Sequence, residues 1–244
     1  MTDIPGWPQR LGLKIHETLD STNEEARRLA AAGEHGPLWI VAREQTAGRG
    51  RRGRAWVSQR GNLFATLLTR AAAPSAAQLA FAAGLAVAQT VAVYAPNVQL
   101  KLKWPNDVLL DGKKSAGILL ESLTPDALAI GIGINLAHHP TDTEFPAISI
   151  AALTGSAPDW DAALLRLAGA IAAWYEVWCD QGFAPVRTAW LARAAGLGRP
   201  IRARLEGSEM QGVFENLDQD GALLLRHESG TLTRITAGEV FLIG

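Results

Sequence analysis

The sequence predicts an α+β fold in which a mixed or antiparallel sheet is flanked by helices and is followed by a small C-terminal β barrel. Short apolar strands recur between residues 38 and 136 at a hairpin-like spacing, which favours antiparallel or mixed pairing. Long apolar or amphipathic stretches at 75–94 and 164–178 have the length and periodicity of helices. Beyond Pro200 the chain changes to four or five short strands in about 45 residues, as in a small barrel.

Composition indicates an ordinary globular protein. The 244 residues suffice for one large domain, or for one domain with a small appendix. Apolar residues make up 48%, charged residues make up 19% and the formal net charge is −1, which is typical of a soluble protein. A general nucleic-acid binder normally shows an excess of basic charge over one face, so we expect no DNA binding.

Targeting signals are not expected. Pro5, Pro8 and Arg10 interrupt any apolar run at the start of the chain, so the sequence predicts no signal peptide. The alanine-rich stretch at 75–94 carries Gln78 and further polar residues, so we expect no membrane-spanning segment. The predicted compartment is the cytoplasm.

The single cysteine, Cys179, excludes an intrachain disulfide and offers no spacing typical of a metal site. Because it lies in an apolar, tryptophan-rich stretch, we expect a buried structural thiol. His138 and His139 form a histidine pair, but no further ligand stands near them in the sequence. We therefore interpret both as loop residues.

The first elements are a short strand at 11–16 and a helix at 23–32 that ends at Gly33. Ser21 or Thr22 can cap this helix, and acidic residues follow in its first turn. Capping alone explains many Ser-Thr-Asn triplets. A helix N-terminus with exposed hydroxyl groups also binds small polar ligands, so both interpretations stay open here.

An arginine-rich segment lies between two predicted strands, at 38–42 and 61–68. Residues 48–54 comprise four arginines and three glycines. Ordering them costs on the order of 7–14 kcal/mol, and a few charge-assisted hydrogen bonds of roughly 1.5–3 kcal/mol each offset most of that cost. We expect a loop that is loose when empty and closes over an anion. A solvated linker or a nucleic-acid contact is the alternative, but the flanking strands favour a binding site.

Further strands are predicted at 100–105, at 113–121 and at 127–136. Two glycines, Gly131 and Gly133, lie inside the last of them. A glycine inside a strand indicates that a ligand or another backbone approaches closely.

Two helices complete the first domain. The amphipathic helix at 164–178 is predicted to begin near Asp159 or Asp161. A second helix is expected at 186–194, with Pro185 near its first turn.

Five motifs, in order along the chain, resemble those of biotin protein ligases. They are Ser21-Thr22-Asn23, Gln45 to Trp56, Lys103-Trp104-Pro105-Asn106-Asp107, Lys114 to Leu119, and Gly131-Ile132-Gly133-Ile134-Asn135. Each motif is modest evidence alone, but together they span nearly the whole chain. The resemblance implies a class II synthetase-like catalytic domain at 1–198 and an SH3-like β barrel at 199–244. The sequence lacks the N-terminal helix-turn-helix of the bifunctional members, so it is similar to the monofunctional type.

The resemblance also implies a two-step acyl transfer. ATP and biotin give biotinyl-5′-adenylate and pyrophosphate, and biotin then passes to a lysine of the biotin carboxyl carrier protein of acetyl-CoA carboxylase or a related carboxylase. Related ligases can pair through a sheet edge, so a homodimer is a candidate assembly for this chain. The alternatives are a lipoate or octanoate ligase or transferase of the same superfamily, a nucleic-acid-binding module, and a non-catalytic biotin-binding protein. The last would lack the lysine and the loop arginines of the site.

Residue roles follow from the motifs. The resemblance implies biotin contacts by Ser21, Thr22, Asn23, Gln45, Arg49, Gly50, Arg51, Lys114, Gly117, Gly131 and Gly133. It implies ATP contacts by Arg49, Arg51, Arg52, Arg54, Trp56, Asn106, Lys114 and Asn135. The catalytic residues implied are Lys114, Arg51 and Asp107.

Charge is the common element of the catalytic roles. Lys114 is expected to stabilise charge as the acyl–phosphate bond forms and breaks. Asp107 is a candidate to orient the attacking lysine or to hold Mg²⁺, and Lys103 is a candidate pairing residue. Mg²⁺ is expected with ATP, held mostly by phosphate oxygens and water rather than by a dedicated protein site.

Overall fold

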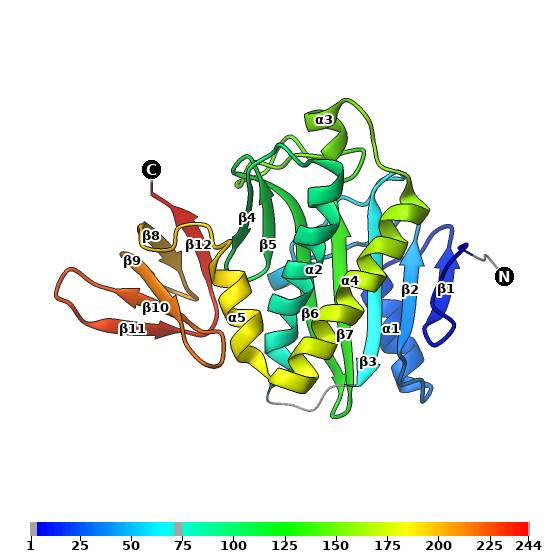
Figure 1. The fold of residues 1–244 in the computed structure, drawn as a ribbon, viewed down its shortest axis with the longest axis horizontal. Helices are drawn as coiled ribbons and strands as arrows, with labels where there is room; N and C mark the ends of the chain where they lie inside the picture. Colours follow the sequence, from blue (N-terminus) through cyan, green and yellow to red (C-terminus); the bar gives the residue numbers. More distant parts are fainter. Residues whose placement is uncertain (1–3, 71–74, 244) are drawn as a thin grey trace.

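The computed structural model describes residues 4–70 and 75–243 of the chain. A large sheet with helices on both faces forms most of the molecule, and a small antiparallel sheet at the C-terminal end forms the rest (Figure 1). The strands of the large sheet are β1 (Gly12–His16), β2 (Leu38–Ala42), β3 (Leu63–Arg70), β4 (Leu100–Lys103), β5 (Asp107–Leu110), β6 (Lys113–Thr124) and β7 (Ala127–Ile134).

The four predicted helices are present, but α3 was not predicted, and residues 75–78 of the second predicted helix form a 3₁₀ turn. The helices are α1 (Thr22–Ala31), α2 (Leu79–Tyr94), α3 (Ile150–Thr154), α4 (Trp160–Gln181) and α5 (Phe183–Leu191), with 3₁₀ turns η1 (Arg51–Gly53) and η2 (Ser75–Gln78). The small sheet consists of β8 (Pro200–Arg204), β9 (Glu209–Leu217), β10 (Leu223–Arg226), β11 (Leu232–Ile235) and β12 (Glu239–Leu242).

The large sheet is mixed. Its strand order is β1-β2-β3-β7-β6-β5-β4, in which β1 and β2 are parallel and every other neighbouring pair is antiparallel. The small sheet has the order β11-β10-β9-β8-β12 and is antiparallel throughout. The predicted α+β class with a mixed sheet is confirmed.

Alternation along the strands assigns side chains to the two faces of the large sheet. Trp39 and Val41 of β2 face the core that lies under α2 and α4, the helices in front of the sheet in Figure 1. Leu38 and Ile40 face the opposite side and pack with Ala26 of α1. Because α1 covers only part of that second face, the remainder is free to form a cavity.

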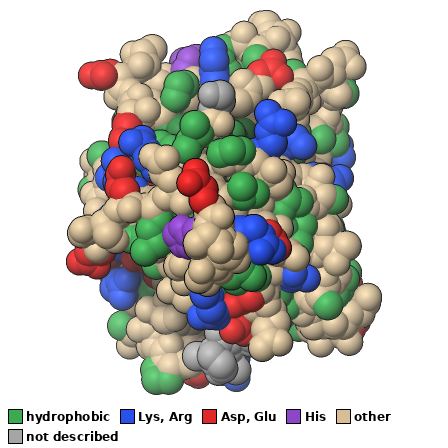
Figure 2. Space-filling view, turned by 90° about the vertical axis from the view of Figure 1, so that its left-hand side faces the viewer, with side chains coloured by type: hydrophobic (Ala, Val, Ile, Leu, Met, Phe, Trp, Pro, Cys, Tyr) green, Lys and Arg blue, Asp and Glu red, His purple; other side chains and the backbone are tan. Residues whose placement is uncertain are grey.

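The small sheet packs against the larger part of the molecule. Trp104 Nε1 donates a hydrogen bond of 3.1 Å to the Gly221 carbonyl, and Arg187 Nε donates one of 2.7 Å to the Leu217 carbonyl. One hydrophobic core runs through both parts and includes Phe214 of β9. Figure 2 views the side of the molecule that carries the small sheet. Basic and acidic side chains are interspersed on that face rather than gathered into one basic patch.

Two details of the prediction were wrong. Cys179 is exposed rather than buried. The buried residues of α4 end at Ile171, and Cys179 lies two turns further on, near the end of the helix at Gln181. The last helix begins at Phe183 rather than near residue 186, directly after α4 ends.

The sequence analysis predicted no membrane-spanning segment. Two helices are nevertheless long and apolar enough to cross a membrane, judged by length and composition alone. They are Ala76–Tyr94 and Trp160–Gln181. About 67% of the first is buried inside the protein. A helix that is apolar on all sides is typical of a buried core position, and core helices of soluble proteins satisfy the same criterion, so this finding is weak evidence for a membrane.

Candidate active site

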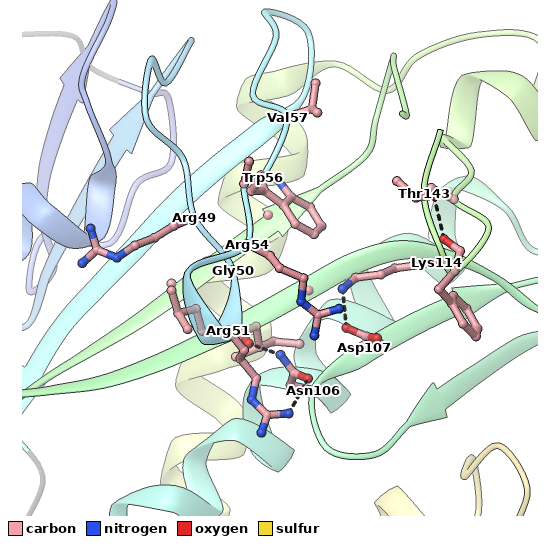
Figure 3. Close-up of a pocket in the computed structure, with 18 of the residues that line it drawn as sticks. Arg49, Gly50, Arg51, Arg54, Trp56, Val57, Asn106, Asp107, Lys114 and Thr143 are labelled. Carbon is pink, nitrogen blue, oxygen red and sulfur yellow. Dashed lines mark hydrogen bonds and ion pairs between the residues drawn. The ribbon is translucent and has the colours of Figure 1, made fainter. Parts of the chain in front are cut away.

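A cavity of about 410 Å³ opens on the sheet face that α1 leaves uncovered (Figure 3). Every predicted site residue lines it except Arg52. Arg52 lies in η1 with φ 56° and is exposed. Lining residues that the sequence analysis did not single out include Thr143, Glu144, Phe145, Glu239 and Phe241.

Glycines form the floor of the cavity. In the sheet register Gly133 of β7 lies next to Gly117 of β6, which in turn pairs with Asp107 of β5. The Trp56 ring rests on this floor, because a Cβ at Gly133 would come within 2.6–2.8 Å of three ring atoms. The ring therefore lies above Gly133, one of the residues that the resemblance implies for biotin binding.

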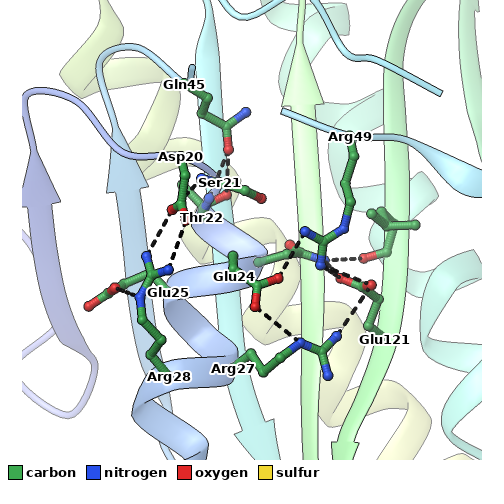
Figure 4. A network of polar contacts seen from close by, with 12 residues as sticks. Asp20, Ser21, Thr22, Glu24, Glu25, Arg27, Arg28, Gln45, Arg49 and Glu121 are labelled. Atoms are coloured by element: carbon green, nitrogen blue, oxygen red, sulfur yellow. Dashed lines mark hydrogen bonds and ion pairs between the residues drawn. The ribbon is translucent and has the colours of Figure 1, made fainter. Parts of the chain in front are cut away.

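Uncharged polar side chains, those of Ser21, Thr22, Asn23 and Gln45, line one end of the cavity, and Figure 4 shows this end beside a network of charged side chains. Ser21 is the N-cap of α1, but its side chain makes no capping hydrogen bond. Thr22 donates to Gln45 Oε1 from its backbone nitrogen at 2.8 Å and from its hydroxyl at 3.2 Å. Thr66 Oγ1 lies 2.6 Å from Asn23 Oδ1. These side chains are thus organised by one another and by the sheet rather than by helix capping.

Arg49 is held by two carboxylates that sequence reasoning missed. Its guanidinium lies 2.9 Å from Glu24 of α1 and 3.3 Å from Glu121 of β6 (Figure 4). Arg27 bridges the same two acids at 3.6 and 3.5 Å. In Figure 3 the Arg49 side chain points away from Lys114. Arg49 thus fastens the arginine-rich segment to α1 and β6 while it also lines the cavity.

The arginine-rich segment is a short hairpin, residues 48–56. Trp56 N donates to the Gly48 carbonyl at 2.9 Å, and Gly50 N donates to the Arg54 carbonyl at 2.7 Å. The turn η1 closes the hairpin. Glycine is needed at position 48, because a Cβ there would crowd the Trp56 carbonyl at 2.8 Å. Whether this hairpin loosens in the empty protein stays a prediction.

Asp107 lies between two lysines (Figure 3). Its Oδ2 is 3.0 Å from Lys103 Nζ, and its Oδ1 is 2.6 Å from Lys114 Nζ. Burial raises the pKa of Asp107, but the ammonium groups of Lys114 and Lys103 outweigh burial and hold that pKa below its usual range. Burial also lowers the pKa of Lys103. Lys103 is therefore part of the charged site and not a solvated strand residue.

A β-bulge directs Lys114 into the cavity. The register between β5 and β6 shifts between Val108 and Leu109, which leaves Ser115 as an extra residue. Without it, Lys114 would share a face with Ala116, which is buried in the core. The sequence signals the lysine, but local pattern alone does not signal the bulge.

A covering loop, residues 137–149, borders the cavity beside Lys114. Lys114 N donates to the Pro146 carbonyl at 2.8 Å, and Asn135 Nδ2 donates to the Ile148 carbonyl at 3.2 Å. Asn135 is implied to contact ATP, and in this structure its amide nitrogen is engaged within the protein. It holds the covering loop against β6.

The small sheet supplies the remaining wall. Arg51 donates to the Gly238 carbonyl at 3.1 Å, across 187 positions of sequence, and to Asn106 Oδ1 at 3.5 Å. Arg54 forms an ion pair with Glu239 of β12. Burial lowers the pKa of Arg51, which means that its charge is partly desolvated. No local sequence pattern predicts such distant partners.

A magnesium site made of protein side chains is not supported. Within residues 4–70 and 75–243, no three or more His, Cys, Asp or Glu side chains gather into a metal-binding group. Both oxygens of Asp107 contact ammonium groups, and Glu239 is paired with arginines. These carboxylates therefore do not fit a divalent cation in this arrangement.

Comparisons with known proteins agree with this geometry. Residues 15–135 match the Biotin/lipoate A/B protein ligase family, and residues 196–243 match the Biotin protein ligase C terminal domain. The chain is 48% identical to the biotin–[acetyl-CoA-carboxylase] ligase of Paracoccus denitrificans, over 92% of this chain and 98% of the relative. It is 34% identical to the bifunctional ligase/repressor BirA of Bacillus subtilis, over 89% of this chain and 70% of that protein.

Solved structures of biotin protein ligases have a similar fold. A biotin protein ligase from Aquifex aeolicus in complex with biotin and ATP has a TM-score of 0.82 at 29% identity, with 95% of this chain and 98% of that chain covered. A biotin protein ligase from Leishmania major in complex with biotinyl-5-AMP has a TM-score of 0.64 at 26% identity, with 94% and 100% covered.

Proposed function

Because the chain belongs to the biotin protein ligase family, we propose that it activates biotin with ATP as biotinyl-5′-adenylate and then transfers biotin to a lysine of a biotin carboxyl carrier protein. The observation that carries this proposal is the convergence of all five motifs on one cavity. That cavity is neutral and polar at one end and cationic at the other. A ligand with a polar uncharged head and an anionic tail fits this division.

The polar end favours biotin over lipoate. Thr22, Asn23 and Gln45 offer hydroxyl and amide groups that can exchange their mutual hydrogen bonds for those of a ureido ring. The dithiolane ring of lipoate has no N–H or carbonyl group, so it offers no hydrogen bonds in exchange for the mutual ones.

The cationic end suits the first step. A carboxylate oxygen of biotin attacks the α-phosphorus of ATP, the P–O bond to the β-phosphate breaks, and pyrophosphate leaves. Attack of one anion on another requires that the charge of both is neutralised. Arg51, partly desolvated, and Lys114, above the glycine floor, are the groups that we assign to this neutralisation. Mg²⁺ enters with ATP and is held by its phosphates.

The second step needs a free amine. The lysine nitrogen of the carrier attacks the acyl carbonyl, the bond to the phosphate oxygen breaks, AMP leaves, and the amine loses a proton. Asp107 is a weak general base for that proton, because the two ammonium groups depress its pKa. We assign it instead to holding Lys114 and Lys103 in place. A water-poor site under the hairpin would protect the adenylate from hydrolysis.

Assembly and location follow as further parts of this proposal. Leu102 N donates to the Arg193 carbonyl at 2.8 Å, which partly covers the β4 edge of the large sheet, so a homodimer would pair through β1 at the other edge. Size-exclusion chromatography with light scattering tests the homodimer, and a monomer at all concentrations would argue against it.

We expect the enzyme to act in the cytoplasm, where ATP is available.

Intact mass measurement of a biotin carboxyl carrier domain tests the proposed function. The domain is incubated with the protein, biotin and MgATP, and it should gain the mass of one biotinyl group. A carrier with arginine in place of its acceptor lysine should gain nothing. No gain with biotin, or an equal gain when lipoate replaces biotin, would contradict the proposal.

A further inference from the structure

An ion-pair chain of four residues borders the cavity: Arg54, Glu239 and Glu144 line it, and Arg204 joins the two carboxylates. They come from the arginine hairpin, from β12, from β8 and from the covering loop. Arg204 binds Glu144 through both carboxylate oxygens at 2.7 and 2.8 Å. The same guanidinium also binds Glu239 Oε2 at 2.6 Å, and the other oxygen of Glu239 pairs with Arg54.

The two inner members of the chain are the less exposed ones. The Glu239 side chain is 15% exposed and that of Arg204 is 31% exposed, whereas Arg54 and Glu144 are 53% and 55% exposed. A bidentate arginine–carboxylate contact fixes orientation as well as position. Phe241 supports Arg204 from below, with the guanidinium 4.7 Å from the ring centre. The chain is therefore a built contact between three segments and not a single pair of mobile surface charges.

Arg204 lies on β8 of the small sheet, where it connects to the covering loop through Glu144 and to the arginine hairpin through Glu239. Through Glu144 it fastens the covering loop, whose Phe145 lies against Lys103. Arg204 also weakens the ion pair between Glu239 and Arg54, because the Glu239 carboxylate is shared between the two guanidinium groups. If Arg204 were neutral, Glu239 would pair with Arg54 alone and would compete more strongly against an incoming phosphate.

We propose that Arg204 is a positioning residue for the nucleotide half of the reaction: it holds the covering loop on the small sheet and shares Glu239, so that Arg54 is able to turn to the ATP phosphates. This inference deepens the proposed function and rests on it. It concerns the phosphate end of the cavity only. The hydrogen bonds of Thr22 and Gln45 at the other end do not involve the four residues of the chain.

Strand β8 offers a matched control for Arg204 outside the ion-pair chain. Arg202 lies two positions earlier on the same strand, β8, and its guanidinium also stacks on Phe241, at 4.8 Å. It pairs with Glu209 at 3.6 Å and takes no part in the ion-pair chain. Arg202→Met and Arg204→Met remove the same chemical group from the same face of one strand. Only the second breaks the chain.

Two measurements test the proposal. Arg204→Met should raise the KM for ATP in adenylate formation by about five- to tenfold, the size expected for one partly buried charge-assisted contact. Its KM for biotin should stay within about twofold of the parent. Calorimetric titration with MgATP in the absence of biotin should show the same loss of nucleotide affinity. Arg202→Met should change none of these values by more than about twofold.

Three results would overturn the proposal. They are an unchanged ATP affinity in Arg204→Met, an equal rise in both KM values, and an equal effect of Arg202→Met. If Arg204→Met does not fold, Arg204→Lys serves instead, because it keeps the charge but loses the bidentate contact and should raise the KM for ATP by about threefold. A parent enzyme that binds MgATP but forms no biotinyl-adenylate would instead contradict the proposed function.

Discussion

Replacing Asp107 by asparagine removes the carboxylate that lies between Lys103 and Lys114 and leaves the shape of the side chain almost unchanged. At 3.0 and 2.6 Å, each ammonium–carboxylate pair is worth about 6 kcal/mol at an effective dielectric constant of ~20. Desolvation offsets much of this gain, because the side chains of Asp107 and Lys103 are only 10% and 8% exposed. Removing one partner from such a buried arrangement costs about 3–5 kcal/mol.

We therefore expect Asp107→Asn to lower the free energy of unfolding by about 3–5 kcal/mol at pH 7, measured by chemical denaturation. Adding Lys103→Met should recover part of the loss, because the double variant no longer buries an unpaired ammonium group. The matched control is Asp111→Asn. Asp111 is exposed in the turn after β5 with φ 46°, a conformation that asparagine adopts readily, so its change should be within about 0.5 kcal/mol.

The pH dependence provides a second check. The pKa of Asp107 in the folded state is below that of the unfolded chain, which is about 3.9. Its stabilising contribution is therefore complete above pH ~4 and is lost as pH falls through the lower folded pKa. The difference between the parent and Asp107→Asn should be largest near neutral pH and should shrink below pH ~4. Equal stabilities at pH 7, or a deficit that does not change between pH 7 and pH 3, would refute this reasoning.

Three further predictions concern the site. Lys114→Met should depress pyrophosphate release by about 10²–10³-fold, as loss of one electrostatic group at the reacting centre does, while circular dichroism stays unchanged; near-normal turnover would remove Lys114 from the chemistry. Gly133→Ala should place a Cβ in the glycine floor, in the space that the Trp56 ring now occupies, and should weaken biotin binding at least about tenfold by calorimetry because the floor is filled, whereas Gly169→Ala, where a Cβ meets nothing within 4 Å, should leave it unchanged. Biotin plus MgATP should protect the bonds after Arg51, Arg52 and Arg54 from trypsin, and equal cleavage with and without ligands would show that the hairpin does not close.

Local periodicity predicted most of the fold. The buried strands β2, β3 and β7 are apolar runs bounded by polar segments. The change to short, closely spaced strands at Pro200 marks the start of β8. These features depend on residues that are close in sequence, where side-chain alternation and turn chemistry act directly. The burial of Cys179 was mispredicted because composition around a helical residue does not say which way that residue faces.

The members of the site were predicted more fully than their contacts. The motifs identified the residues that line the cavity, but the partners of Arg49 and Arg54 lie on α1, β6 and β12. Such pairings depend on how distant elements pack, and no spacing rule encodes them. The direction of Lys114 likewise depends on a bulge that only the pairing with β5 reveals. The ion pairs that fasten Arg49 to α1 and β6 are known from the structure alone, and its contact with biotin and ATP stays a prediction.

The most direct test of the account is the amount of biotinyl-5′-adenylate that the protein retains without a carrier. The protein is mixed with biotin and MgATP and passed quickly through a desalting column, and the bound adenylate is measured by mass spectrometry. The account predicts close to one adenylate per chain for the parent and substantially less for Arg51→Ala, whose side chain joins the hairpin to the small sheet. Free release of the adenylate by the parent, or equal retention by both proteins, would contradict the claim that the cavity under the arginine hairpin holds the activated acyl group.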